Sequence, residues 1–502
     1  MSEHILILLN ERSRTDFLDD LQQLIHSFSN HSLLLYFTTS SPEIEMGIPF
    51  PFRHFPRQYT GRIPVLNSGI SRDEFNITLI INLSGQNILD DQLRNIPEIK
   101  SDFFSQLYMQ YCPAIIHGII QQHNQCSFAV TLRDKKNTIY QLTKGSFKLL
   151  NYDYKKALEL IFLGNIRLLA DGLKRYFKNQ IGNIFDNDST TESINPAKLH
   201  LLKRRLNQNK FKHRIQQLFY SDKWNIGIID ASLEEVALQK DKIWEVKWLE
   251  EAKETQFNAD PFGCEIDGNH ILLFENYINE KGKISSKINA EEIRSKLELP
   301  IHLSYPYTLF YEGSWYCLPE QSASNKLEVF QIHPTTYQLE HPVEILSNFK
   351  AVDPSLILKD EKWYLFCTDA SDKGADVRLH IFIADTLTGP YRPHQKNPVK
   401  TDISSARCGG KIFTHEGIIY RPSQDSSETY GGEIVIQRID LLTEEKFSET
   451  EINRIQPSHL QGKYNKGCHT LSSLGKRTLV DGKRDIFSFR NFFQKFRKKQ
   501  NA

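Results

Sequence analysis

Residues 258–275 read NADPFGCEIDGNHILLFE: an Asp-Pro pair opens an apolar run, a Gly-centred turn follows, and a second apolar run ends on Glu275. The same order of features recurs along the chain at intervals of about 45 to 60 residues, the range typical of repeat folds. The further copies are 304–320 (SYPYTLFYEGSWYCLPE), 352–368 (VDPSLILKDEKWYLFCT), 407–422 (RCGGKIFTHEGIIYRP) and 468–481 (CHTLSSLGKRTLVD). Five copies predict a five-bladed β-propeller, in which every innermost strand begins near one central channel.

The composition is that of a folded protein rich in β-structure. Hydrophobic residues make up 39% and charged residues 25%, which excludes a disordered chain. The 31 Phe and 20 Tyr against 3 Met favour aromatic-rich strands over helical bundles. The net charge is +1, so no nucleic-acid partner is expected. Seven Cys without a CxxC pair indicate neither a disulfide framework nor a zinc site.

A chain of 502 residues predicts two to three domains. Strand-like runs alternate with helical spacing at the N-terminal end, which predicts an α/β domain with a largely parallel sheet. The predicted parts are an α/β domain at 1–180, a polar linker and basic segment at 181–214, the propeller at 215–485, and a basic amphipathic tail at 486–502.

The predicted location is cytoplasmic. The N-terminal apolar run at 4–9 is too short for a signal peptide, and no apolar run approaches the length of about 20 residues that spans a bilayer. In the tail, Phe489, Phe492, Phe493 and Phe496 share one helical face and alternate with basic residues. Such a helix either lies peripherally at the inner membrane face or docks its Phe face on the propeller.

Carboxylates recur in the same phase of the repeats. Asp260 opens the first copy and Asp353 the third, each followed by Pro, and Glu275 and Glu320 end second strands. Chemistry at a glycosidic bond needs two carboxyl groups that flank the anomeric carbon. We therefore predict Asp260, Glu320 and Asp353 as catalytic residues and Glu275 as a binding residue. The alternative is that each acid caps a strand against a neighbouring N–H group or Arg.

Further polar and aromatic residues follow the same phase and could line a saccharide site. Tyr305 could stack on a sugar ring, and Arg421 could hold a carboxylate or phosphate, or else pair with Asp353. His469 could face the channel as a metal or water ligand, or serve a structural role. The predicted substrate-binding residues are Glu275, Tyr305, Arg407, Arg421, Gln424, Asp425, Tyr430 and His469.

These motifs, in this order, resemble the N-terminal-domain family of glucosamine inositolphosphorylceramide transferase. That family is itself similar to the five-bladed arabinanase- and xylosidase-type glycoside hydrolases. The resemblance covers roughly residues 215 to 485. The bacterial members carry a formyltransferase-like, Rossmann-type N-terminal domain, which the resemblance implies for residues 1–180. A catalytic Asn-His-Asp set for formyl transfer is not found here, so this domain is expected to be structural or to bind a partner.

The resemblance also implies roles for single residues. Asp260 matches the general base of the hydrolases. Glu320 precedes Asp353 along the chain, which inverts the usual order of the two further acids. His469 resembles a channel histidine that helps to hold calcium in some hydrolases, so the resemblance implies a calcium ion in the channel.

Three functions remain open at this point. The first is sugar transfer in the synthesis of a surface polysaccharide or glycolipid, with a saccharide or glycolipid substrate. The second is hydrolysis of small oligosaccharides by a five-bladed glycoside hydrolase. The third is a non-catalytic, glycan-binding propeller that serves a partner transferase.

Overall fold

The computed structural model describes residues 3–10, 18–27, 32–38, 65–66, 76–84, 93, 95–107, 112–185, 195–253, 256–289, 294–371 and 374–487. The chain forms two compact units, Met1–Lys212 and His213–Ala502. The predicted tail begins at the end of the described residues, and its Phe face lies outside them.

The first unit is an α/β domain built on one sheet. The strand order is β3-β2-β1-β4-β5-β6-β7, parallel from β3 to β5 and antiparallel from there on. The strands are β1 (Glu3–Asn10), β2 (Ser32–Thr38), β3 (Val65–Leu66), β4 (Asn76–Asn82), β5 (Glu98–Ser101), β6 (Gln125–Arg133) and β7 (Ile139–Lys148). The helices are α1 (Leu18–His26), α2 (Asp102–Gln106), α3 (Pro113–Gln121), α4 (Tyr154–Phe177) and α5 (Pro196–Phe219).

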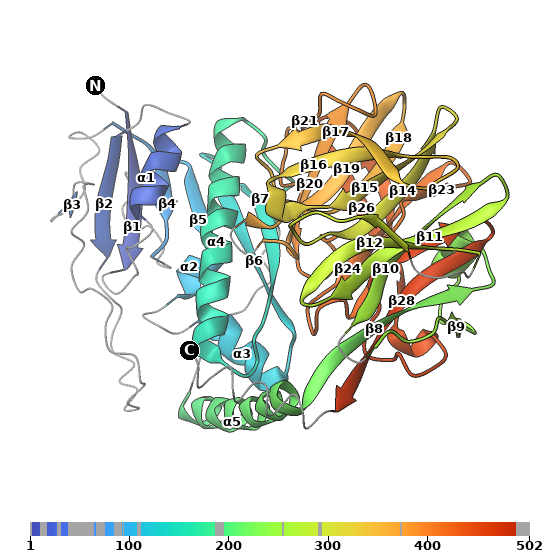
Figure 1. The fold of residues 1–502 in the computed structure, drawn as a ribbon. Helices are drawn as coiled ribbons and strands as arrows, with labels where there is room; N and C mark the ends of the chain where they lie inside the picture. The colour runs from blue at the N-terminus through green and yellow to red at the C-terminus, as the bar shows by residue number, and fades with distance from the viewer. Residues whose placement is uncertain are drawn as a thin grey trace. The chain divides into compact units, whose positions relative to one another are not determined.

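The apolar runs of this unit form its core. Ile5, Leu6 and Ile7 of β1 are fully buried, as expected for a central parallel strand that is covered on both faces. Helix α4 packs on β7 and β6 (Figure 1), and its Gly164 and Gly172 lie where an added Cβ would meet Phe147 and Val130. The predicted α/β sheet is therefore present.

The Rossmann-type, formyltransferase-like character of this unit stays a prediction. Of the connection between the parallel strands β1 and β2, the described part is helix α1 and the residue after it. The predicted basic segment lies within α5, in which Leu199 and Leu202 are the buried residues. Among the described helices, none combines the length and apolarity that a membrane span requires.

The second unit is mostly β-structure with a propeller-like arrangement. It contains four sheets of four strands each: β10-β11-β12-β13, β14-β15-β16-β17, β23-β24-β25-β26 and β27-β28-β8-β9. The bounds of the first two sheets are β10 (Phe257–Ile266), β11 (Asn269–Ile278), β12 (Lys281–Ile288), β13 (Arg294–Leu297), β14 (Ser304–Tyr311), β15 (Ser314–Glu320), β16 (Lys326–Ile332) and β17 (Leu339–Ser347). Those of the other two are β23 (Phe413–His415), β24 (Ile418–Asp425), β25 (Glu433–Leu442), β26 (Phe447–Ile455), β27 (Leu471–Leu474), β28 (Arg477–Phe487), β8 (Tyr220–Ile229) and β9 (Lys247–Trp248), with helix α6 (Leu233–Leu238) between β8 and β9.

The prediction of five blades is met in part, because four separate sheets are present. The third sequence copy does not form a sheet of its own, although its strands are bonded in the order β18-β19-β20-β22 and β21 pairs with β20. These strands are β18 (Ala351–Lys359), β19 (Lys362–Asp369), β20 (Arg378–Ala384), β21 (Arg392–Pro393) and β22 (Lys400–Asp402).

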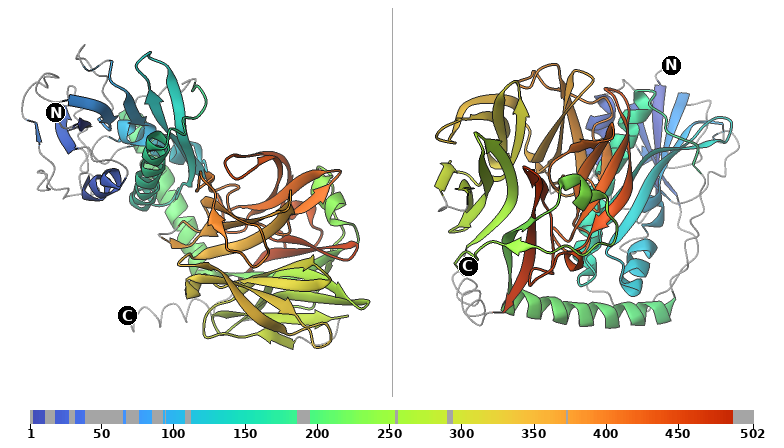
Figure 2. Two further views of the ribbon diagram at one scale, coloured as in Figure 1. Left: turned by 90° about the horizontal axis from the view of Figure 1, so that it is seen from above. Right: turned by 90° about the vertical axis from the view of Figure 1, so that its right-hand side faces the viewer.

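The innermost strands stand next to one another. Strand β10 contacts β14 and β27, and β14 contacts β18. Gly410, just before β23, forms a parallel bridge with Leu471 of β27. The two ends of the unit are joined because β8 pairs with β28 over their whole length, from Tyr220 opposite Phe487 to Ile229 opposite Thr478 (Figures 1 and 2). The inner starts of the strands thereby meet at one centre, as the repeat predicts.

Candidate functional site: a cluster of channel carboxylates

Three sequence landmarks share one backbone geometry at the inner ends of their strands. Asp260, Tyr305 and Asp353 have φ values of 51°, 44° and 48°, a left-handed conformation that is uncommon for residues other than glycine. Each precedes a proline, and the strand register shifts at each of these positions. The bulge turns each of the three residues out of the regular strand pairing.

Carboxylates hold these bulges to the neighbouring blades. Asp481 Oδ2 accepts the N–H of Asp260 at 3.2 Å, and Glu320 Oε2 accepts the N–H of Asp353 at 3.2 Å. Asp260 Oδ2 in turn accepts the N–H of Tyr305 at 3.2 Å. Because these backbone donors are buried, each would cost about 1–3 kcal/mol if left unpaired. The capping alternative considered for the acids therefore holds for Glu320, and also for Asp260 beside any further role.

His469 lies between two buried carboxylates. Its Nε2 is 3.1 Å from Asp260 Oδ1, and its Nδ1 is 2.8 Å from Asp481 Oδ2, although the second contact is not aligned as a hydrogen bond. Burial alone would lower the pKa of His469, but Asp481 and Asp260 outweigh it and raise the pKa to about 10. Burial alone would raise the pKa of Asp260, but His469, with smaller contributions from Thr470 and Arg407, reverses this and the pKa lies below its usual range. The triad is a charged imidazolium held by two acids.

Among the described residues, Asp260, His469 and Asp481 are also the group whose side chains could together ligate a metal ion. One ligand atom from each lies within 4.8 Å of the others. Calcium takes six to eight oxygen ligands. Here Asp481 Oδ1 already accepts the N–H groups of His469 and Thr470 at 2.9 and 3.0 Å, and Asp260 Oδ1 accepts the Thr470 hydroxyl at 2.9 Å. The donors that converge on these oxygens suit a protonated histidine, so the residues do not fit the implied calcium ion.

Asp353 is clamped by side chains of the fourth sequence copy. Arg407 Nε and Gln424 Nε2 both donate to Asp353 Oδ2 at 2.6 Å. Arg407 also donates to the Tyr430 hydroxyl at 3.2 Å and lies over the Tyr430 ring, 5.0 Å from its centroid. Tyr430 as a residue is partly exposed, at 40%, and its ring also lies 5.4 Å from that of His469. The structure thus brings the predicted residues Asp353, Arg407, Gln424 and Tyr430 together.

Glu275 lies beside the same cluster with few partners. Its backbone pairs with Ala259, next to Asp260, and its side chain is buried. Burial and the negative charges of Asp260, Glu320 and Asp353 raise its pKa well above the usual range, with His469 opposing. Among the described residues, the ion-pair partner of its carboxyl is His302, with Nε2 at 3.3 Å from Oε1.

Three predicted binding residues do not fit the predicted role. Tyr305 is fully buried, and its hydroxyl accepts from the Gly410 N–H at 2.7 Å, so its ring offers no surface to a sugar. Arg421 is fully buried and forms two hydrogen bonds with Glu449, at 2.7 and 2.9 Å, rather than with Asp353. Asp425 accepts from Arg454 at 2.8 Å, outside the cluster. In each case a partner supplied by the fold satisfies the side chain.

Sequence reasoning missed Asp481, Thr470 and His302 as site residues. Asp481 is the last residue of the fifth sequence copy, the phase that Glu275 and Glu320 occupy in theirs, so the repeat pattern carried a signal for it. Thr470 follows His469 in the landmark itself. His302 lies in the connection before the second copy, and no repeat marks it.

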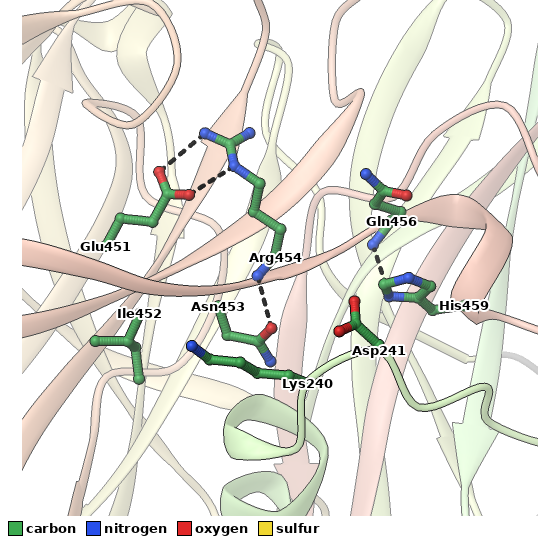
Figure 3. A pocket seen from close by; sticks show the side chains of 8 residues that line it. All are labelled: Lys240, Asp241, Glu451, Ile452, Asn453, Arg454, Gln456 and His459. Atoms are coloured by element: carbon green, nitrogen blue, oxygen red, sulfur yellow. Dashed lines mark hydrogen bonds and ion pairs between the residues drawn. The ribbon is translucent and has the colours of Figure 1, made fainter.

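A separate cavity of about 420 Å³ lies on β26 and the chain after α6 (Figure 3). Its lining residues are Lys240, Asp241, Glu451, Ile452, Asn453, Arg454, Gln456 and His459. Arg454 is bound to Glu451 at 2.7 and 2.9 Å, and Asn453 donates to Ala237 O at 2.8 Å. None of the predicted site residues lines it, so it is distinct from the carboxylate cluster.

Residues 246–483 match the family model described as "Glucosamine inositolphosphorylceramide transferase 1, N-terminal". The resemblance read from the sequence is confirmed for these residues. Relatives with the name glucosamine inositolphosphorylceramide transferase 1 include a protein of Oryza sativa subsp. japonica, 32% identical over 213 residues, and one of Arabidopsis thaliana, 28% identical over 213 residues. The first match covers 40% of this chain and 28% of the relative, and the second covers 39% and 27%. The chain therefore spans less than a third of these relatives.

Solved structures with a low similarity include a thermostable family-43 glycoside hydrolase, with a TM-score of 0.34, 12% identity, and coverage of 45% of this chain and 93% of that one. Another is the α-L-arabinanase of Cellvibrio cellulosa, with a TM-score of 0.32, 14% identity, and coverage of 42% and 87%. Matches at this level say nothing about activity.

Proposed function

We propose that this chain is a carbohydrate-active protein that transfers a sugar during synthesis of a glycolipid or surface polysaccharide. The site is the carboxylate cluster of the propeller channel, and the strands β18, β19, β20 and β22 act as the fifth blade. One observation carries the proposal: Asp260 and Glu275 lie on paired strands, and their surroundings shift their pKa values in opposite directions. Two carboxyl groups tuned apart in this way are suited to act as base and acid.

The roles follow from the protonation states. Glu275, which keeps its proton, gives it to the oxygen that leaves the anomeric carbon. Asp260, which is ionised, takes the proton of the attacking hydroxyl group. Both Asp260 oxygens already have partners, but a carboxylate offers about four acceptor positions, so a further hydrogen bond is available. Asp260 thus keeps the catalytic role expected from the sequence.

The other acids hold the site in shape. Glu320 accepts the Asp353 N–H through Oε2 and the Ser322 hydroxyl, at 2.9 Å, through Oε1. Burial raises the pKa of Asp353 as it does that of Glu275, but the Asp353 carboxyl is occupied by Arg407 and Gln424. We therefore assign Glu320 and Asp353 to positioning rather than to proton transfer. Tyr430, a partly exposed residue whose ring lies next to Arg407 and His469, is the residue that we assign to sugar stacking.

The names of the relatives suggest the substrates. They identify glucosamine as the sugar and inositolphosphorylceramide as the acceptor of those proteins. An excess of carboxylates over cations in the channel suits a sugar that carries an amino group, because its ammonium form is attracted by the cluster. A cytoplasmic position with contact at the inner membrane face would bring the protein to such a lipid, and we propose that location with it.

The test uses the full chain with radiolabelled nucleotide-sugar donors, amino sugars among them, and vesicles that contain an inositolphosphoryl sphingolipid. If the protein transfers sugar, we expect radiolabel in the lipid extract. Release of free sugar from aryl glycosides without any lipid or nucleotide requirement would instead support the hydrolase.

Saccharide binding in calorimetry with no turnover of any donor would support the non-catalytic propeller. This alternative has its own support, because the match covers only 28% of the first rice relative. The N-terminal α/β unit would then bind the partner.

A further inference from the structure

The surroundings of Glu275 include a histidine that the sequence repeat does not mark. His302 lies in the connection before β14, with its side chain 45% exposed and its Nε2 3.3 Å from Glu275 Oε1. The two groups are within ion-pair distance, but the contact is not aligned as a hydrogen bond. Catalytic hydrogen bonds are often long or poorly aligned before substrate binds and tighten in the complex. The approach is therefore close enough to matter for the Glu275 carboxyl.

The absence of a side chain at Gly282 of β12 allows His302 to approach Glu275. An added Cβ there would lie 2.5 Å from Glu275 Oε1, 2.8 Å from His302 Cε1 and 2.4 Å from the Leu303 carbonyl oxygen. No side chain larger than hydrogen fits without moving the pair. The Leu303 N–H donates to the Gly282 carbonyl at 3.0 Å, which holds the connection against β12.

The same glycine sets the tautomer of His302. The Gly282 N–H donates to His302 Nδ1 at 3.0 Å, so the Nδ1 lone pair is occupied and carries no proton. In the neutral imidazole the proton is then on Nε2, which faces Glu275. His302 is therefore a neutral donor, in contrast to the cationic Arg407 beside Asp353.

We propose that His302 is a positioning residue for Glu275: its Nε2–H holds Oε1 in place and leaves Oε2 to carry the acid proton toward the substrate. When that proton has passed to the leaving oxygen, the same N–H stabilises the new carboxylate, and His302 keeps its own proton throughout. This inference rests on the proposed function for the identity of the reaction, but the contact itself does not depend on it.

The charged groups around the pair agree with a neutral donor. Burial is the largest influence on His302 and lowers its pKa, as does Lys281, while Asp260 opposes them. Glu275 faces Asp260, Glu320 and Asp353, which raise its pKa, and His469, which lowers it. A cationic partner would draw the proton from Glu275, whereas a neutral N–H lets the acid stay protonated.

The decisive experiment follows the Glu275 carboxyl in the full chain by carbon NMR of glutamate labelled at Cδ, with Glu275→Gln to identify its signal. In His302→Ala the carboxylate loses a donor, so the pKa of Glu275 should rise by about one unit. His302→Gln keeps an N–H donor and should return the pKa toward that of the wild type. An unchanged or lowered pKa in His302→Ala, or a His302→Gln variant that behaves like it, would overturn the proposal.

His270→Ala is the matched control. This histidine is 37% exposed and lies 4.0 Å from another acid of the same sheet, Glu265. It should leave the pKa of Glu275 where it is in the wild type. A shift equal to that of His302→Ala would show a general effect of removing imidazoles and would contradict a specific contact.

Turnover separates this inference from the proposed function. On a transferable substrate, His302→Ala should lower kcat roughly 100-fold with little change in KM, because the acid is misplaced rather than lost. If the wild-type chain turns over no glycan while the Glu275 titration still responds to His302, the proposed function fails and the contact stands. If turnover is present and neither the titration nor kcat responds, the positioning role fails.

Discussion

At the level of single residues, His469 is the side chain on which the channel depends most. It is the one imidazole between two buried acids among the described residues, and it keeps Asp260 and Asp481 from repelling each other. Removing one partner of a buried ion pair costs about 3–5 kcal/mol, because the remaining charge stays buried. We expect His469→Gln to lower the free energy of unfolding by about this amount in urea denaturation at pH 7, with His270→Gln nearly unchanged.

The same residue predicts a pH dependence. Its pKa is raised from 6.5 to about 10 in the folded protein. The contribution of His469 to the free energy of unfolding is therefore fully present below about pH 6.5 and is lost as the pH rises through 10. The slope of this loss is up to about 1.4 kcal/mol per pH unit. Wild-type stability should fall relative to His469→Gln between pH 7 and pH 10. A difference that stays constant over this range would contradict a charged histidine.

The Tyr305→Phe variant tests whether the buried Tyr305 stabilises the fold rather than binding a sugar. Its hydroxyl serves the Gly410 N–H and lies 3.0 Å from Ser355 Oγ, so Tyr305→Phe leaves buried polar groups unpaired. The expected loss of unfolding free energy is about 1–3 kcal/mol. Saccharide affinity in calorimetry should not change, whereas Tyr430→Ala should weaken it. Weaker binding in Tyr305→Phe with unchanged stability would restore the stacking role predicted from the sequence.

At the level of elements, Gly410 marks a very close approach between two neighbouring blades. Its φ is 133°, and an added Cβ would lie 1.9 Å from the Leu471 carbonyl oxygen, in the bridge that joins the fourth and fifth copies. We expect Gly410→Ala to separate this bridge and to cost more than about 3 kcal/mol by thermal denaturation.

Gly417→Ala is the matched comparison for that substitution. Gly417 has a φ of 78° but open space around its Cβ position. Its replacement by Ala should therefore lower the free energy of unfolding only by the backbone strain, about 1–2 kcal/mol. Equal losses in the two variants would show that strain alone, and not the close approach, is responsible.

The elements also show how far the sequence could predict this site. The phase of Asp260, Tyr305 and Asp353 was readable because each precedes a proline in the same place of the repeat, and all three share the left-handed bulge. The partner that each side chain contacts could not be predicted from the repeat. Arg421 binds Glu449 on the outer strand of its own sheet. The two residues are 28 positions apart in the sequence, and their contact depends on how the strands of the sheet pair. His302 lies in a connection, whose position follows from packing rather than from a repeat.

At the level of the whole molecule, the ring is closed by its first and last strands. Strands β8 and β28 lie about 250 residues apart in the chain, yet they pair along their full length. A chain that lacks residues 213–229 should leave the edge of β28 and the apolar face of the last sheet uncovered. We expect loss of the cooperative unfolding transition in circular dichroism, while a chain of residues 213–502 should keep it. A folded protein without β8 would contradict closure by this pair.

In the proposed function, Asp260 and Glu275 act together on a sugar. The most direct measurement is the initial rate of label transfer to inositolphosphoryl sphingolipid vesicles by the wild type, Asp260→Asn, Glu275→Gln and the control Asp425→Asn. The account predicts a loss of at least about 100-fold in kcat for each of the first two variants, with retained saccharide binding and folding, and no change for Asp425→Asn. Wild-type rates in Asp260→Asn or Glu275→Gln would contradict it.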